Sequence, residues 1–494
     1  MSKTGADHLK SLDDGREVFI NGALVDDPVN HPAFRNSVRS AAALYDFQAE
    51  NLDLMTYESP TSGKPVNLAW LLPKSYEDLV RRREAITAWS RQTYGFMGRS
   101  PDHIASSLVG QVMGLPLFEE HNPKCARAIW NYYEYARDND VYLTYVIINP
   151  QADRSKDTGD QEDEFLTTAI VDEDSEGITV RGAKMLGTSS IMANDVLVAN
   201  IQPLVEGEEK YAISFAVGLG TKGIKIMSRK SYEENAVSQF DYPLSSQFDE
   251  NDALIYFDDV KVPWDRVFVY RGLDMCRAQV QDTWAHSSQN YQCQIRLKVK
   301  MRFLMGLILK VCETNGTSAF PAVRDQLGRL AAQAAMVDGM MHGIEAAGED
   351  YNGYFMPNRH LVYAAQSMTQ EMYPQMVNVM RELSGGGLIM LPSSAADFAN
   401  PELAELIHRT QKSSVTDSEG RVKLMKLAWD ALGSEFASRH IQYEMFYAGA
   451  QFVTRGHMYR TYPWEDATGM VDELLASYDL KDSMISRRKS QAAE

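Results

Sequence analysis

"YAISFAVGLGTKGIKIMSRKS", residues 211–231, decides the fold class, because two different folds use its glycine pattern. The segment GLGTKG (218–223) has the G-x-G-x-x-G spacing of a loop that cradles dinucleotide phosphates. Such a loop leads from a strand into a helix, whose N-terminal amides meet the pyrophosphate. Here Ile224 and Ile226 alternate with polar or longer neighbours, which is typical of a strand. We therefore predict a β–β connection and place the nucleotide site elsewhere.

The hydrophobic period changes twice along the chain. The N-terminal and C-terminal regions carry apolar residues at helical spacing. Between them lie short β-rich runs separated by Gly, Asp and Pro. The sequence therefore predicts an α+β protein with an N-terminal helical domain at 1–140, a middle β domain at 141–270 and a C-terminal helical bundle at 271–494.

Composition narrows the functional classes. The chain has 494 residues and a formal net charge of -18, which argues against general affinity for nucleic acids or anionic membranes. No apolar run approaches the length of a membrane span, and the N-terminal residues have no apolar core of a signal peptide. The four cysteines show neither a CxxC pair nor metal-ligand spacing. We expect a cytoplasmic protein with reduced thiols and no metal site.

Seven further segments occur in a fixed order over nearly the whole chain. They are DGREVFINGALVDDPVNHPAFRNSVRSAAALYDF (14–47), GRSPDH (98–103), INPQADRS (148–155), VRGAKMLGTSSIMAND (180–195), YFDDVKVPWDRVF (256–268), RELSGGGLIMLPSS (381–394) and SRHIQYEMFYAG (438–449). Together they resemble the 4-hydroxyphenylacetate 3-monooxygenase oxygenase components and their relatives, the chlorophenol and nitrophenol monooxygenases. The resemblance is closest to the chlorophenol and nitrophenol branch.

This resemblance implies a fold, a reaction and partners. The fold would be that of acyl-CoA dehydrogenases, with a β-barrel as the middle domain, and the assembly a homotetramer. The enzyme would be a two-component monooxygenase that receives reduced FAD, by diffusion, from a separate NAD(P)H:flavin reductase. O2 would be the co-substrate, and a phenol ring would attack the terminal oxygen of a flavin C4a-hydroperoxide.

Three residues are expected to lie beside the phenol. Arg99 is a candidate for holding the phenolate oxygen, because a fixed cation favours the deprotonated form. His103 follows four residues later and shares its helical face if a helix begins near Pro101. In the 4-hydroxyphenylacetate branch we expect Tyr in place of His103 and His in place of Tyr145. The resemblance therefore points to another phenol, halogenated or nitrated, with loss of halide or nitrite.

Further catalytic and substrate-binding candidates lie in the C-terminal zone. An imidazole titrates near neutral pH, so His286 suits a general base toward a phenol, as the halogenated-phenol branch implies. Arg439, Tyr443 and Phe446 are spaced by four and three residues and share one helical face. Such a face is often ordinary packing, but the resemblance makes it a second wall of the substrate cavity.

The expected flavin contacts come from three segments. Amide and guanidinium groups can bond the isoalloxazine or a phosphate, small hydroxyls can bond ring heteroatoms, and a glycine turn exposes amides to a pyrophosphate. The resemblance implies that the glycine turn often serves the flavin of a neighbouring subunit. The candidates are Asn149, Gln151, Arg154, Thr188, Ser189, Ser190, Gly385, Gly386, Gly387, Pro392 and Ser393.

Two alternatives remain open at this stage. The first is 4-hydroxyphenylacetate 3-hydroxylation within the same class. The second is a lyase like 4-hydroxybutyryl-CoA dehydratase, which belongs to the same fold family and holds a [4Fe–4S] cluster beside its flavin. Such a cluster needs soft ligands, mostly Cys thiolates, and the cysteines here are few and scattered.

Overall fold

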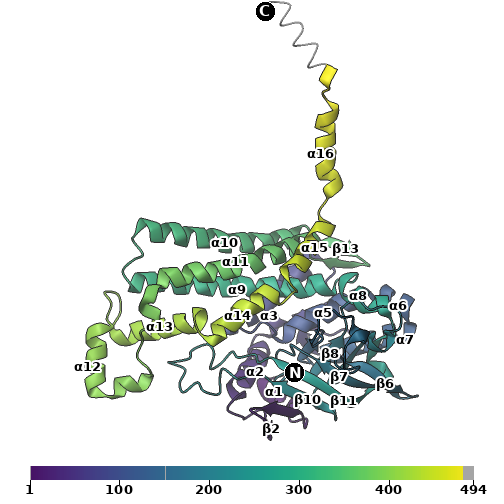
Figure 1. Cartoon of the computed structure of the whole chain (residues 1–494), viewed down its shortest axis with the longest axis horizontal. Coiled ribbons are helices and arrows are strands. Elements are labelled where there is room, and N and C mark those ends of the chain that lie inside the picture. The colour runs from purple at the N-terminus through teal and green to yellow at the C-terminus, as the bar shows by residue number, and fades with distance from the viewer. Residues whose placement is uncertain (1, 151, 482–494) are drawn as a thin grey trace, which may run out of the picture.

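A computed structural model describes residues 2–150 and 152–481, and its first part is mostly helical (Figure 1). Ser75 accepts a hydrogen bond from the first turn of one of these helices, and prolines occupy the first turns of three others. The helices are α1 (Gly5–Ser11), α2 (Arg35–Glu50), α3 (Leu52–Met55), α4 (Tyr76–Gln92), α5 (Pro101–Met113), α6 (Leu115–His121) and α7 (Pro123–Asp138). A small hairpin of β3 (Thr56–Glu58) and β4 (Pro65–Asn67) lies between α3 and α4.

Two sheets form the middle of the chain. One has the order β2-β1-β10-β11-β7-β6, where β1 is Glu17–Ile20 and β2 is Ala23–Val25, and the other has the order β12-β9-β8-β5. Buried apolar residues of both sheets share one hydrophobic core, and a bridge between Ile148 and Met185 joins the sheets at one corner. The expected barrel is therefore a pair of facing sheets. The strands are β5 (Leu143–Val146), β6 (Ala169–Glu173), β7 (Gly177–Lys184), β8 (Asp195–Ala199), β9 (Ile213–Gly218), β10 (Ile224–Ser228), β11 (Ala253–Pro263) and β12 (Val267–Tyr270).

Long helices return after β12. The three longest, α9, α10 and α11, run side by side, and α16 projects away from the body of the molecule (Figure 1). The helices are α8 (Leu273–Gln281), α9 (Ala285–Thr314), α10 (Pro321–Ala346), α11 (Arg359–Ser384), α12 (Pro401–Thr410), α13 (Ser418–Leu432), α14 (Glu435–Phe446), α15 (Gln451–Thr461) and α16 (Trp464–Ala476). The hairpin of β13 (Glu349–Tyr351) and β14 (Tyr354–Met356) separates α10 from α11. Within the described residues, no helix has the length and apolar character that a membrane crossing requires.

The N-terminal zone is not entirely helical. Strand β1 (Glu17–Ile20) pairs in parallel with β10, and β2 (Ala23–Val25) pairs antiparallel with β1. Both strands thus extend a sheet of the middle zone, across the boundary predicted at residue 140. The short apolar run that forms β1 has no helical period, and a sheet edge far along the chain supplies its hydrogen bonds.

The glycine-rich segment connects two strands, as its sequence predicts. Strand β9 ends at Gly218 and β10 begins at Ile224, so no helix follows the third glycine. The connection passes from the four-stranded to the six-stranded sheet. Asp241, which follows at the distance of a ribose-binding acid, instead accepts hydrogen bonds from the Ala395 amide and pairs with Lys426 at 3.1 Å.

We expect Gly220→Ala to lower the free energy of unfolding by about 1–3 kcal/mol, because the added methyl group overpacks the site. A Cβ at Gly220 would lie 2.3 Å from the Asp14 carbonyl oxygen. Gly218→Ala is the matched control, since its Cβ would meet nothing closer than 3.7 Å. Urea unfolding of both variants checks this. Equal stability of the two would contradict it, and neither change should alter flavin affinity.

Candidate active site

Arg99 is the centre of a buried polar cluster at the start of α5. Arg99 lies just before the N-cap residue Ser100, and its side chain bonds the ring of His103 in the first turn of α5, so the two side chains lie together as expected. The guanidinium also lies 5.0 Å from the ring centroid of Tyr145 on β5 and 5.2 Å from that of Tyr443 on α14. Four candidates that the sequence assigned to the phenol site therefore come together, from three separate elements.

Gln289 of α9 completes this cluster, and the sequence analysis missed it. Its side-chain nitrogen lies 3.2 Å from Nε2 of His103 and donates to the Tyr145 hydroxyl at 3.3 Å. Both Arg99 and Gln289 thus point N–H groups at Nε2 of His103, which makes this atom an acceptor. Burial, followed by the charges of Arg99 and Arg296, lowers the pKa of His103 well below its usual value. His103 is therefore a neutral imidazole.

Tyr443 adds to this cluster a hydroxyl whose hydrogen-bonding capacity is not used by the described residues. Its ring lies 5.2, 4.9 and 5.4 Å from the guanidinium carbons of Arg99, Arg439 and Arg296. The hydroxyl is buried and has no hydrogen-bond partner among the described residues. Burial raises the pKa of Tyr443 despite these cations, so the group stays protonated. A buried hydroxyl of this kind suits a polar ligand atom.

Residues 250–252, which we call the acidic strap, accept hydrogen bonds from Arg99 and from Arg439. The Arg99 backbone amide donates to the Glu250 carboxylate, while the Arg99 carbonyl accepts from the Tyr142 hydroxyl at 2.5 Å. Arg439 donates to Glu250 at 2.9 Å and to both oxygens of Asp252 at 3.0 and 2.6 Å. All three guanidinium nitrogens of Arg439 are thus engaged. Arg439, which was expected in a wall of the substrate cavity, thus bonds the strap.

The strap also holds Thr188, the first of the expected flavin hydroxyls. Thr188 donates to Asp252 at 2.6 Å, and its carbonyl accepts from Thr144 of β5 at 2.6 Å. Tyr145 follows Thr144 on β5, and successive side chains of a strand point to opposite faces, so the Thr144 side chain that bonds Thr188 and the side chain of Tyr145 leave the strand on opposite sides. Thr188 is 6% exposed, whereas Ser189 and Ser190 are 0% and 1% exposed. Thr188 is therefore the most exposed of the three residues.

Asn149 lies inside a buried hydrogen-bond network beside this segment. Its Oδ1 accepts from Thr167 at 2.7 Å and from the ammonium of Lys184, and its Nδ2 donates to Gln202 at 2.9 Å. Burial lowers the pKa of Lys184 to about 7. Asn149 therefore has at most one N–H left for a cofactor. Arg154 is exposed, and Gln151 lies outside the described residues.

The glycine turn lies far from the Arg99 cluster within this chain. Gly385–Leu388 forms a short 3-10 helix after α11, and Asn315 donates to the Ser384 carbonyl at 3.5 Å. This contact places the turn at the C-terminal end of α9, about 45 Å along the helix from its start. All three glycines are exposed, with open space where a Cβ would lie. Of the other candidates here, Pro392 is half-buried, and exposed Ser393 bonds Asp397 at 2.9 Å.

His286 lies in the first turn of α9, one turn before Gln289, but its ring contacts other residues. Its centroid lies 5.5 Å from Tyr363 and 5.0 Å from His457. Burial, with the charges of His457 and Arg359, lowers the pKa of His286 to about 3. The imidazole is neutral at physiological pH but weakly basic, which disfavours the role of general base. Phe446, by contrast, is 47% exposed at the end of α14.

The depressed pKa of His286 predicts a loss of stability in acid. Unfolding restores an ordinary histidine pKa near 6.5, so the unfolded state binds more protons than the folded state between pH 6.5 and about 3. Stability is therefore retained above pH 6.5 and falls below it. We expect His286→Gln to remove about 2 kcal/mol of the loss between pH 7.5 and 5. Urea unfolding at both pH values checks this, with exposed His342→Gln as the unaffected control. An unchanged acid response in His286→Gln would contradict it.

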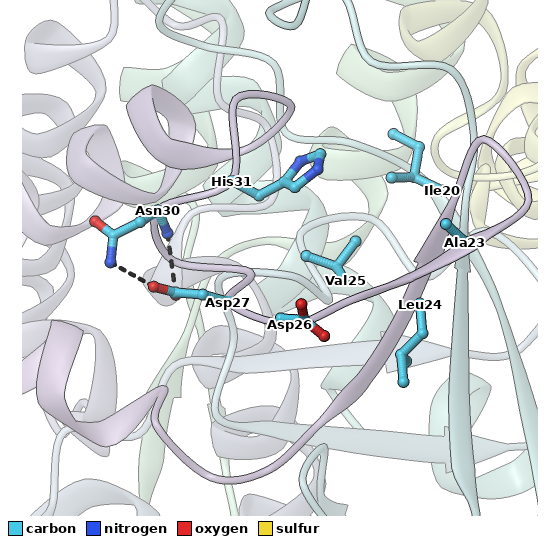
Figure 2. A pocket seen from close by; sticks show the side chains of 8 residues that line it. All are labelled: Ile20, Ala23, Leu24, Val25, Asp26, Asp27, Asn30 and His31. Carbon is cyan, nitrogen blue, oxygen red and sulfur yellow. Dashed lines mark hydrogen bonds between the residues drawn. The ribbon is translucent and has the colours of Figure 1, made fainter.

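A surface hollow elsewhere contains none of these residues. It is lined by the β1–β2 hairpin and the following turn, where Asn30 donates to Asp27 at 2.8 Å (Figure 2). Its other lining side chains include Leu24 and His31. The hollow is therefore separate from the Arg99 cluster.

Two family models cover most of the chain. Residues 4–269 match the model of the 4-hydroxyphenylacetate 3-hydroxylase N terminal part, and residues 276–476 match the C terminal part. Among curated relatives, the 4-hydroxyphenylacetate 3-monooxygenase oxygenase component of Geobacillus sp. is 34% identical over 91% of both chains. The 4-nitrophenol 2-monooxygenase oxygenase component of Rhodococcus sp. is 35% identical over 97% of this chain and 92% of its own.

Solved structures agree with this match. The crystal structure of a 4-hydroxyphenylacetate 3-monooxygenase oxygenase component, complexed with FAD and 4-hydroxyphenylacetate, superposes with a TM-score of 0.91. It is 31% identical and covers 96% of this chain and 99% of its own. The acyl-CoA dehydrogenase of Geobacillus kaustophilus, at 13% identity, has a TM-score of 0.52 and covers 92% and 96%. These likenesses confirm the predicted fold class.

Proposed function

Because the chain belongs to the 4-hydroxyphenylacetate 3-hydroxylase family, we propose that it hydroxylates a halogenated or nitrated phenol, with release of halide or nitrite. The chain is a flavin-dependent aromatic monooxygenase, with FAD as its cofactor and O2 as its co-substrate. We propose that it is the oxygenase component of a two-component system. A separate NAD(P)H:flavin reductase would supply the reduced FAD by diffusion.

The observation that carries the substrate proposal is the cluster of Arg99, His103, Tyr145 and Gln289. These four side chains form one hydrogen-bonded and stacked group with a fixed cation at its centre. The neutral His103 and the phenolic Tyr145 stand where the 4-hydroxyphenylacetate branch is expected to have the reverse pair. A changed pair at this place changes which ring substituents the pocket accepts, while Arg99 remains for the phenolate.

Each residue of the cluster has a physical task in this proposal. Arg99 favours the deprotonated phenol, and a phenolate ring is a stronger nucleophile than a neutral phenol. His103 and Gln289 hold the guanidinium and the Tyr145 hydroxyl in place. The unpartnered Tyr443 hydroxyl is free to bond a ring substituent. The Thr188 oxygen as an acceptor and the remaining N–H of Asn149 as a donor fit the polar edge of FAD, which when bound would supply the activated oxygen.

The place of the glycine turn supports a site shared between copies of the chain. Gly385, Gly386 and Gly387 have open space around them and lie at the opposite end of α9 from His286. We propose that they contact the FAD of a neighbouring copy, within a homotetramer. A chain that forms no oligomer would then bind FAD weakly.

The decisive experiment supplies the pure protein with enzymatically reduced FAD, O2 and a panel of phenols. The panel contains 4-hydroxyphenylacetate, 4-nitrophenol and chlorophenols, and both hydroxylated product and released halide or nitrite are measured. We expect product from the nitro- or chlorophenols above that from 4-hydroxyphenylacetate. Preferential turnover of 4-hydroxyphenylacetate would replace the substrate proposal with the 3-hydroxylase alternative.

The lyase alternative receives little support from the cysteines. Cys125 lies on α7 and Cys276 on α8, while Cys293 and Cys312 lie on one helix, nineteen residues or about 28 Å apart. Among the described residues, no group of three or more His, Cys, Asp and Glu is placed to hold a metal ion. Iron analysis of the purified protein tests this alternative directly.

A further inference from the structure

The contact between Thr188 and Asp252 fixes which way a hydroxyl proton points. Thr188 Oγ1 lies 2.6 Å from Asp252 Oδ1. Burial alone would raise the pKa of Asp252, but the charges of Arg439 and Arg229 outweigh it and hold the pKa far below its usual value. Asp252 is therefore a carboxylate, which accepts hydrogen bonds and cannot donate them. The hydroxyl proton of Thr188 must point at the carboxylate.

With its proton engaged, Thr188 presents only lone pairs to a ligand. A free threonine hydroxyl can rotate to donate or to accept, but this one retains only its capacity to accept. The charge-assisted bond to Asp252 is stronger than a neutral hydrogen bond, so rotating the proton toward a ligand would be unfavourable. The ligand atom that matches Thr188 is thus a donor, such as a ring N–H.

Reduced and oxidised isoalloxazine differ in this property at one ring position. In oxidised flavin N5 carries a lone pair and no hydrogen, whereas in reduced flavin N5 carries an N–H. A hydroxyl that can only accept hydrogen bonds accepts one from the N5–H of the reduced ring. The same hydroxyl makes no hydrogen bond with N5 of the oxidised ring, because two lone pairs then face each other. We propose that Asp252 is a positioning residue that makes Thr188 an obligate acceptor and thereby gives the site its preference for reduced over oxidised flavin.

This inference rests on the proposed function, in which the flavin arrives already reduced and leaves oxidised. A site that discriminates between the two redox states retains the reactive form and releases the spent form. The strap supplies this selectivity through a residue that need not touch the cofactor. Asp252 also forms ion pairs with Arg229 and Arg439, so two arginines from distant parts of the chain stabilise its charge.

The test measures flavin affinity, with no phenol present and no turnover. The dissociation constant of oxidised FAD is measured aerobically by fluorescence, and that of reduced FAD anaerobically by calorimetry, for the full chain and its variants. In Asp252→Asn, the amide oxygen can stay with Nε of Arg439 and Nε of Arg229, which bond Oδ2, so the amide nitrogen replaces Oδ1 beside Thr188, loses the bond from Nη2 of Arg439 and frees the hydroxyl proton for the ligand. We expect the preference for reduced over oxidised FAD to fall about tenfold.

Two further variants separate this effect from a general loss of structure. Thr188→Val removes the acceptor and should weaken binding of reduced FAD about tenfold, with oxidised FAD little affected. Asp249→Asn is the matched control, because Asp249 also pairs with Arg229, at 2.6 Å, but has no contact with Thr188. The preference of Asp249→Asn for reduced over oxidised FAD should equal that of the natural protein. Circular dichroism confirms that each variant is folded.

The possible outcomes distinguish a failure of this inference from a failure of the proposed function on which it rests. If the natural protein binds neither form of FAD, both the proposed function and this inference are overturned. If it prefers reduced FAD and that preference persists in both Asp252→Asn and Thr188→Val, only the role of Asp252 and Thr188 is overturned. A fall in both variants, with Asp249→Asn unchanged, supports the inference.

Discussion

Replacement of Arg99 by methionine is expected to reduce product formation by roughly 100-fold, because it removes the cation that we propose stabilises the phenolate in the transition state. Methionine is close to arginine in length, and its thioether can pack against the rings of Tyr145 and Tyr443 where the guanidinium now makes cation–π contacts. It cannot bond His103, however, and it leaves no positive charge on this face of α5. The flavin should still become oxidised, with its reducing equivalents released as hydrogen peroxide.

The protonation state of a bound phenol gives a direct measurement of this effect. 4-Nitrophenolate is yellow and its protonated form is nearly colourless, so the colour of the bound ligand near pH 6 reports the charge beside it. We expect a yellow complex with the natural protein and with Arg99→Lys, and a colourless one with Arg99→Met. Arg455→Met, at an exposed ion pair, is the control and should behave as the natural protein. Equal product yields in all variants would remove Arg99 from the site.

Replacement of Glu444 by glutamine is expected to lower the free energy of unfolding by about 3–5 kcal/mol. Glu444 pairs with Arg296 through two hydrogen bonds and with Lys300 at 3.0 Å, and all three side chains are at most 1% exposed. Burial would raise the pKa of Glu444, but the charges of Arg296 and Lys300 outweigh it and lower the pKa to about 2. The variant leaves two buried cations without their anion.

Chemical unfolding of Glu444→Gln and of a surface variant checks the size of this effect. Glu371→Gln removes an ion pair with Arg455, whose partners are 55% and 57% exposed, and should cost less than about 1 kcal/mol. A loss of similar size in both variants would show that burial does not raise the contribution of the Glu444 cluster. Because Arg296 also stacks on Tyr443, a destabilised cluster should loosen the phenol site as well.

Local sequence signals predicted the parts of the site that lie within one element. The four-residue spacing of Arg99 and His103, with Pro101 between them, was sufficient to predict a helix that begins near Pro101 and brings the two side chains together. The strand after Gly223 was equally visible in the alternation of its residues. Such patterns reflect the period of one helix or strand, and they need no knowledge of what packs against it.

The missed residues act across long separations in the chain. Gln289 reaches His103 over 186 residues, and Glu250 reaches Arg99 over 151. Gln289 is one of many polar residues in the first turns of α9, and its sequence neighbours give no sign of the partner. Arg439 was predicted as a substrate contact because its helical face was identified correctly, but the acids that occupy it come from the strap.

The acidic strap has a consequence for redesigning the substrate range. Its two carboxylates are committed to the Arg99 backbone, to Arg439 and to Thr188, so a change there disturbs several parts of the protein at once. The side chains of His103 and Tyr145, by contrast, contact Arg99, Gln289 and each other, and neither bonds the strap. Changes at positions 103 and 145 therefore leave the bonds of the strap in place. A mutant library restricted to these two positions, with Arg99 and Gln289 retained, would test whether the proposed pocket accepts other ring substituents.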